Sequence, residues 1–181
     1  MNAFHRFIGH LTTITRHRHM VIAQCAKAGI LWQGIFHDLS KYSPAEFLPG
    51  VKYYSGEHSP TEDERRENGY SKAWMHHKGR NRHHWEYWTD YDYSKNCYMP
   101  AQMPRRYVAE MLCDRIAASK IYKGGAYTDA APYEYLAHGR MRDNMNPETL
   151  DVHLRFLVQL RDEGETAMFA ALRAYVREKE F

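Results

Sequence analysis

Hydrophobic positions recur along this chain at the three- and four-residue spacing typical of amphipathic helices. The spacing predicts a helix over residues ~10–28, with Gly29 as a C-terminal stop. A short apolar helical segment follows, from Ile30 to Leu39. A longer helix is predicted from Pro104 to Lys123, because apolar side chains form a stripe there and two glycines come directly after it.

Other helix starts are indicated by local capping patterns. Two Ser-Pro-x-Glu boxes begin at Ser43 and Ser59, and in each the serine can cap, the proline can occupy the first helical position and the glutamate can reach back to the cap. A C-terminal helical region is predicted over about residues 146–180, divided at Gly164. Residues 79–103 are the least regular, and no segment alternates as a strand does. The predicted fold class is therefore all-α.

Composition narrows the class of protein. A length of 181 residues fits a single domain, 1–181. The net charge of +3 is too small for the concentrated basic stripe of a nucleic-acid binder, so a nucleic-acid partner is not expected. No apolar run reaches the length of a membrane span, and the N-terminus lacks a secretory apolar region. Three cysteines without a C-x-x-C pair favour a reducing compartment, so we expect a cytoplasmic protein.

Histidine is the residue type that stands out, with 12 copies. Histidine is the commonest metal ligand in proteins, so function is sought where histidines gather with acids. His37 and Asp38 are adjacent at the end of the short apolar segment. Neighbouring residues on a helix point about 100° apart, so the two side chains can reach one metal only at a helix end or a kink.

Three further positions extend this pair into a candidate site. His17 lies at the rim of the first helix, with His19 as its rival on another face. Asp114 lies in the middle of an apolar helix, where a carboxylate is costly unless it binds a cation or pairs with an arginine such as Arg115 or Arg106. Glu110 lies one turn before Asp114 on the same face. Four more histidines follow one another closely: His76, His77, His83 and His84. We expect His77 and one of the later pair to bind metal, with the others hydrogen-bonding around them.

These residues resemble the ordered motif of the HD-domain superfamily of metal-dependent phosphohydrolases: a helix-borne histidine, a His-Asp pair, further histidines and a late aspartate. The string His-Asp-Leu-Ser-Lys is similar to the His-Asp-x-Gly-Lys of many members, with Ser40 in place of glycine. More closely, the chain resembles an uncharacterised bacterial HD-like family of unknown function over nearly its whole length. The resemblance implies a single HD-like helical domain, with a metal-site core over about residues 10–123 and additional C-terminal helices. It implies the metal ligands His17, His37, Asp38, His77, His83, His84 and Asp114.

This ligand set predicts one or two divalent transition-metal ions, with Fe, Mn, Zn, Co and Ni not distinguished. Asp38 is the natural bridge between two ions, and a water acidified by them is the expected nucleophile. Lys41 and Arg80, with Arg82 as the alternative to Arg80, are expected to neutralise phosphate oxygens. The predicted reaction is hydrolysis of a phosphate ester of a nucleotide or small phosphorylated metabolite. The alternatives are a di-iron oxygenase on the same scaffold and a catalytically silent module that binds metal or nucleotide. The C-terminal helices serve packing or subunit contact, and a homo-oligomer is compatible with them.

Overall fold

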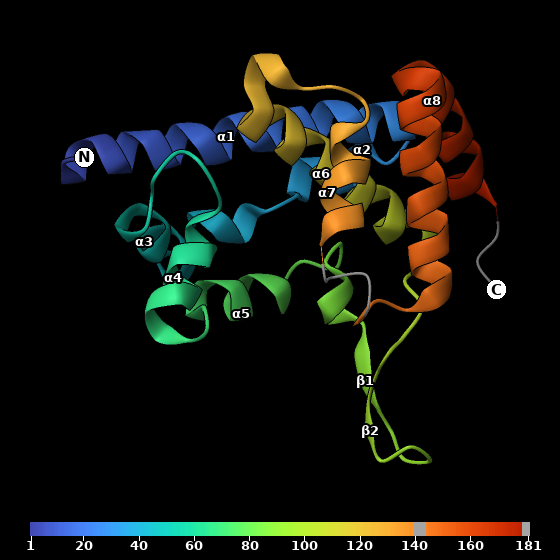
Figure 1. Ribbon diagram of the computed structural model, residues 1–181, viewed down its shortest axis with the longest axis horizontal. Coiled ribbons are helices and arrows are strands. Elements are labelled where there is room, and N and C mark those ends of the chain that lie inside the picture. The colour runs from blue at the N-terminus through green and yellow to red at the C-terminus, as the bar shows by residue number, and fades with distance from the viewer. Residues whose placement is uncertain (140–143, 179–181) are drawn as a thin grey trace.

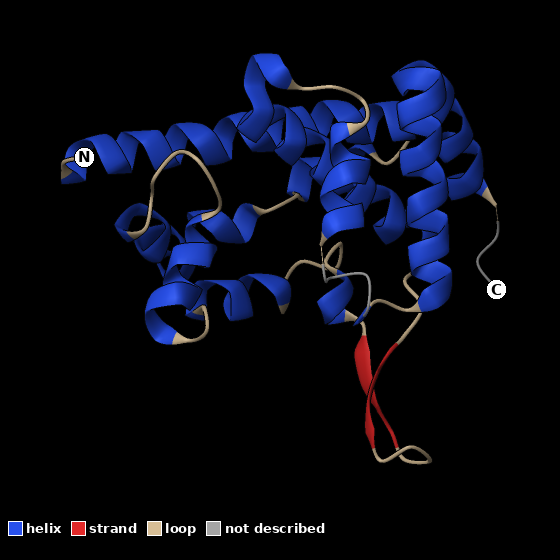
Figure 2. Cartoon of the chain, in the orientation of Figure 1, coloured by secondary structure: helices blue, strands red, loops and turns tan. Residues whose placement is uncertain are grey.

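The computed structural model describes residues 1–139 and 144–178 and confirms the predicted all-α class (Figures 1 and 2). None of the described helices is long and apolar enough to cross a membrane. The α-helices are α1 (Ala3–Ala28), α2 (Leu31–Phe36), α3 (Pro44–Lys52), α4 (Pro60–Asn68), α5 (Lys72–Lys78), α6 (Arg105–Lys123), α7 (Ala131–His138) and α8 (Pro147–Arg177). The 3-10 turns are η1 (Leu39–Tyr42), η2 (Trp85–Tyr87) and η3 (Gly124–Ala126), and the strands are β1 (Thr89–Asp92) and β2 (Cys97–Pro100).

Several boundaries differ from the sequence-based prediction. Helix α1 begins at Ala3 rather than near residue 10, because the Asn2 side chain accepts a hydrogen bond from the His5 amide and caps the helix. Helix α7 was not predicted. Gly164, with φ of 83°, breaks α8 as expected. Helix α8 ends at Arg177, and the predicted end near Glu180 lies outside the described residues.

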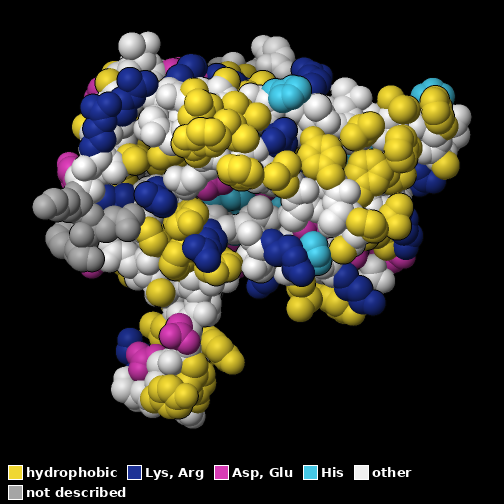
Figure 3. Space-filling model, turned by 180° about the vertical axis from the view of Figure 1, so that it is seen from behind, with side chains coloured by type: hydrophobic (Ala, Val, Ile, Leu, Met, Phe, Trp, Pro, Cys, Tyr) yellow, Lys and Arg dark blue, Asp and Glu magenta, His cyan; other side chains and the backbone are white. Residues whose placement is uncertain are grey.

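The irregular stretch 79–103 contains a hairpin that the pattern analysis missed. Strands β1 and β2 pair antiparallel from Thr89–Pro100 to Asp92–Cys97, and the hairpin projects away from the helices (Figure 1). It escaped detection because both strands are short and largely exposed, so they carry no buried alternation. Hydrophobic side chains nevertheless cover part of it, among them the exposed Tyr93 and Tyr98 (Figure 3).

The main hydrophobic core joins α1, α6 and α8. Its buried members include Val21 and Cys25 of α1, Leu112 and Ile116 of α6, and Leu157 of α8. Complete burial of one such aliphatic side chain contributes about 1.5–3 kcal/mol. This core fixes α1 beside α6, and these are the two helices that carry His17 and Asp114.

Helix α2 packs directly on α1. The chain reverses at Gly29, whose φ of 80° is in the left-handed region that glycine adopts without strain. Gly34 then lies so close to α1 that a Cβ added there would be 2.7 Å from the Cys25 Cβ. A guanidinium NH₂ group of Arg18 on α1 donates to the Ile35 carbonyl at the end of α2. The C-terminal end of α2 is therefore held against α1.

Candidate metal site

The His-Asp pair lies at a helix end, as its spacing requires. His37 follows α2 with φ −54° and ψ 130°, and Asp38 has φ 55° and ψ 22° in the left-handed region. Aspartate tolerates this conformation better than most residues because its short polar side chain can bond locally. The break in helical geometry turns both side chains to one side, and His37 Nε2 lies 3.2 Å from Asp38 Oδ2.

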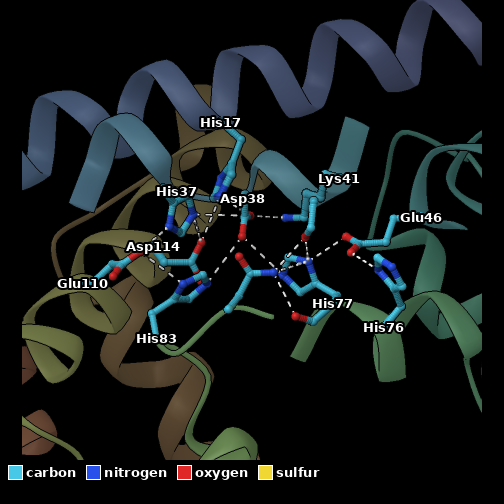
Figure 4. A network of polar contacts seen from close by, with 12 residues as sticks. His17, His37, Asp38, Lys41, Glu46, His76, His77, His83, Glu110 and Asp114 are labelled. Atoms are coloured by element: carbon cyan, nitrogen blue, oxygen red, sulfur yellow. Dashed lines mark hydrogen bonds and ion pairs between the residues drawn. The ribbon is translucent and has the colours of Figure 1, made fainter. Parts of the chain in front are cut away.

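One half of the cluster surrounds Oδ2 of Asp38. His17 reaches it from α1, with its Nε2 3.8 Å from Asp38 Oδ2 and 2.9 Å from Asp114 Oδ1 (Figure 4). His37 Nε2 lies 3.4 Å from the same Asp114 oxygen. One ligand atom from each of these four residues lies within 4.8 Å of the other three. Asp114 therefore faces histidines rather than Arg115 or Arg106, its predicted alternative partners.

The other half surrounds Oδ1 of Asp38. His77 Nε2 lies 3.3 Å from this oxygen and His83 Nε2 lies 3.5 Å from it. His84 joins the same group of mutually close donor atoms. Asp38 is thus the residue shared by two donor groups that together contain all seven predicted ligands: His17, His37, Asp38, His77, His83, His84 and Asp114. The exposed His19 lies outside both groups.

Seven donor atoms of this cluster are buried without a regular hydrogen bond, although Lys41 Nζ lies 2.6 Å from Asp38 Oδ2 and His17 Nε2 lies 2.9 Å from Asp114 Oδ1. The atoms in question are both carboxylate oxygens of Asp38 and the Nε2 atoms of His17, His37, His77, His83 and His84. A buried polar atom without a partner costs about 1–3 kcal/mol. Imidazole nitrogens and carboxylate oxygens are also the donors that first-row divalent metals accept. The donor set therefore fits one or two such ions, which these nitrogen and oxygen atoms would hold.

Two glutamates hold the histidines from outside. Glu110 Oε1 lies 3.0 Å from Nδ1 of His37 and 3.2 Å from Nδ1 of His83. Burial raises the pKa of Glu110, but the hydrogen bonds from these two rings outweigh it and lower the pKa to about 2. Glu46 Oε2 lies 2.7 Å from Nδ1 of His77. A carboxylate that accepts from Nδ1–H fixes the tautomer in which Nε2 carries the free lone pair, as metal-binding histidines require.

Sequence reasoning did not identify Glu46 as part of the site. The Ser-Pro-x-Glu pattern assigned it to a helix cap, and α3 does begin at Pro44, but the Ser43 side chain makes no capping hydrogen bond. Glu46 instead binds His77 and, through Oε1 at 2.6 Å, His76. The bond to Glu46 also accounts for His76, which is absent from both donor groups. The sequence did indicate Glu110, because it lies one helical turn before Asp114 on the same face, but it did not indicate that Glu110 binds His37 and His83.

The predicted cationic residues separate into two places. Lys41 Nζ lies 2.6 Å from Asp38 Oδ2. Burial alone would lower the pKa of Lys41, but Asp38 and Asp114 raise it above its ordinary value. Arg80 is exposed and donates to the His76 carbonyl at 3.3 Å, and exposed Arg82 donates to the Tyr107 hydroxyl at 3.4 Å. Neither arginine lines the cavity beside the cluster, so the structure does not place Arg80 where it was predicted to act.

A cavity of about 410 Å³ opens beside the cluster. His17, His77, His84, Asp114 and Lys41 line it together with several aromatic side chains, including Trp74 and Trp85. Its volume lies within the range of ~300–1,000 Å³ typical of small-molecule sites. A larger hollow of about 950 Å³ lies between the start of α6 and α8 and contains none of the cluster residues.

Comparison with known families identifies the family of this chain, but that family has no assigned function. Residues 6–157 match a family described as a family of unknown function, DUF5662, and the chain belongs to this family. No curated protein and no solved structure matches the chain.

Proposed function

We propose that this DUF5662 member binds one or two divalent transition-metal ions at the Asp38 cluster and hydrolyses a phosphate ester in the adjoining cavity. The observation that carries the proposal is the position of Asp38. Its Oδ2 faces His17 and His37, and its Oδ1 faces His77 and His83. A carboxylate whose two oxygens face different histidine pairs could hold one ion through each oxygen, and paired ions would suit phosphoester displacement.

In such a site, glutamates and a lysine of the chain would position the metal ligands. Bound divalent ions supply Lewis acidity and lower the pKa of water. Glu46 and Glu110 hold the histidine rings in the tautomer that presents Nε2, and Lys41 fixes one oxygen of Asp38. The cavity beside them holds the organic part of the substrate and separates it from bulk water. The similarity to the HD-domain motif supports the same reaction class, because the residues occur in the superfamily's order.

The first test is the metal content of protein purified without an affinity tag or a chelator. We expect about one or two equivalents of a first-row metal, and phosphate release from a panel of nucleotides and sugar phosphates. His37→Ala and Asp114→Ala should lose metal and activity. His19→Ala is the matched control, because His19 lies on the same helix as His17 but is exposed, and it should retain both.

The outcomes separate the candidate functions. Stoichiometric iron with absorbance that changes on exposure to oxygen, and no phosphate release, would favour the oxygenase. Protein that binds no metal when titrated would favour the silent module and would refute the proposal. Full metal content in folded His37→Ala and Asp114→Ala would show that the ligands are assigned wrongly.

A further inference from the structure

Arg115 is a cation in the cavity wall that the mechanism above does not use. It follows Asp114 on α6 and lines the same cavity as the cluster. Its side chain contacts the Tyr135 ring and His153, and no carboxylate of the described residues lies within ion-pair distance of it. Glu86 also lines the cavity, but it makes no ion pair with Arg115. Arg115 therefore has charge and donors to offer to a bound molecule.

His153 orients the Arg115 guanidinium through a hydrogen bond to Nε. Arg115 Nε donates to His153 Nε2 at 3.0 Å, and His153, on α8, is fully buried. Burial and the neighbouring Arg115 charge lower the pKa of His153 well below its ordinary value, so the ring is a neutral acceptor. Because Nε is committed to His153, the terminal NH₂ groups are the donors left for the cavity. These groups form the planar pair that binds phosphate or carboxylate oxygens.

The cations that the sequence predicted for phosphate binding are not available for this task. Lys41 is paired with Asp38, and Arg80 and Arg82 are exposed outside the cavity. Lys123 lines the cavity, but its side chain is exposed to solvent. Asp114 and Glu86 act on this partly enclosed guanidinium electrostatically, but neither forms a direct ion pair with it, so an anion of the ligand would stabilise it further.

We propose that Arg115, positioned by His153, binds a phosphoryl oxygen of the substrate, and that the substrate is a small organic phosphate whose phosphoryl group lies between Arg115 and the Asp38 cluster. This inference rests on the proposed function and adds the recognition residue to it. The cavity of about 410 Å³ limits the organic part to a single small unit. Trp74 and Trp85 in its wall favour a flat or apolar group over a polymer.

The test is calorimetric titration of metal-loaded protein with inorganic phosphate. Arg115→Met should weaken phosphate binding by about 10- to 100-fold, the loss typical of one charge-assisted hydrogen-bonding partner, and should leave metal content unchanged. Arg115→Lys keeps the charge but not the paired donors, and it should give an intermediate affinity. Arg66→Met removes an exposed arginine of α4 as the matched control and should bind phosphate as the wild type does.

His153 is tested by rescue. His153→Leu should weaken phosphate binding, because it removes the acceptor that orients Arg115. His153→Gln should restore most of the affinity, because its amide oxygen can accept from Arg115 Nε. A purely structural role would change the melting temperature in both variants without this recovery of phosphate affinity.

The possible failures are distinguishable. If Arg115→Met binds phosphate as tightly as the wild type while the wild type hydrolyses phosphate esters, the inference is wrong and the proposed function stands. If phosphate binding depends on Arg115 but no ester is hydrolysed, the recognition residue is supported and the hydrolase proposal fails. Absence of phosphate binding by metal-loaded wild type would overturn the inference.

Discussion

Gly34→Ala tests whether the contact between α1 and α2 sets the geometry of the cluster. A Cβ at this position would lie 2.7 Å from Cys25 Cβ, 3.1 Å from Ile22 Cα and 3.3 Å from Cys25 Sγ. Carbon atoms in contact prefer ~3.5–4.0 Å, so α2 must move from α1 by about 1 Å. The Ile22 atom belongs to the backbone, so a change of rotamer cannot relieve the contact.

This displacement passes directly to the candidate ligands. Helix α2 ends at Phe36, one residue before His37, whereas His17 is fixed on α1. Metal sites tolerate about 0.2 Å in their ligand distances, and a shift of about 1 Å at a reacting centre costs about 10²-fold. We therefore expect metal affinity to fall by about 10- to 100-fold. Overpacking costs about 1–3 kcal/mol and the better helix propensity of alanine returns up to about 1 kcal/mol, so the free energy of unfolding should fall by about 0–3 kcal/mol.

The assay combines metal titration with urea unfolding in the presence of a chelator. Gly125→Ala is the control, since an added Cβ there has no neighbour within 4 Å, and it should change neither quantity. If Gly34→Ala binds metal with wild-type affinity and unfolds at the same urea concentration, the spacing of α1 and α2 does not position His37 and Asp38.

Three further measurements follow from the same contacts. Burial, with a smaller contribution from Lys41, lowers the pKa of His10 to about 4, so as pH falls His10 is protonated in the unfolded chain before it is protonated in the folded protein. The free energy of unfolding should therefore decline by up to about 3 kcal/mol between about pH 6.5 and pH 4. Urea unfolding of His10→Leu over the same pH range should show a smaller decline. Glu46→Gln should weaken metal binding by about 10- to 100-fold in a competition assay, because His77 loses the carboxylate that fixes its tautomer, and exposed Glu67→Gln should not. Metal at 100 times its dissociation constant should raise the free energy of unfolding by about 2.7 kcal/mol, and melts with and without chelator should coincide in Asp114→Asn if Asp114 is a ligand.

The sequence predicted those parts of the site that depend on local rules. The end of α2 at His37-Asp38 followed from the angle between neighbouring helical residues, and Asp114 stood out because an apolar helix does not favour an unpaired carboxylate. The histidine run indicated that His77 and one of His83 and His84 would bind metal, without deciding between the last two. Each of these inferences needed only a few consecutive residues, and the structure brings them together around Asp38.

The features that were missed depend on partners distant in sequence. Glu46 fits a capping box, but its partners His76 and His77 lie about thirty residues away, and the two tertiary contacts replaced the local one. His153 joins Arg115 from α8 across 38 positions, and no periodicity indicates such a pair. Arg80 lies beside the histidine run in sequence, yet it extends to solvent beyond the end of α5.

The charge within and around the cluster gives an independent reason to expect cations there. Among the described residues, the carboxylates of Asp38, Glu46, Glu110 and Asp114 converge on it, and Lys41 is the ammonium paired with them. Without metal, this excess negative charge is balanced only in part. Burial opposes the protonation of His37, but the carboxylates around it outweigh burial and raise its pKa well above the ordinary value. Burial lowers the pKa of His17, His77 and His84. The four carboxylates and Lys41 together carry a net charge of about −3 when the imidazoles are neutral. Two divalent ions would turn this into about +1, and Arg115 adds one more positive charge. The resulting excess of about two charges matches a phosphate dianion, so the same arrangement that attracts the metals leaves the cavity suited to the proposed substrate.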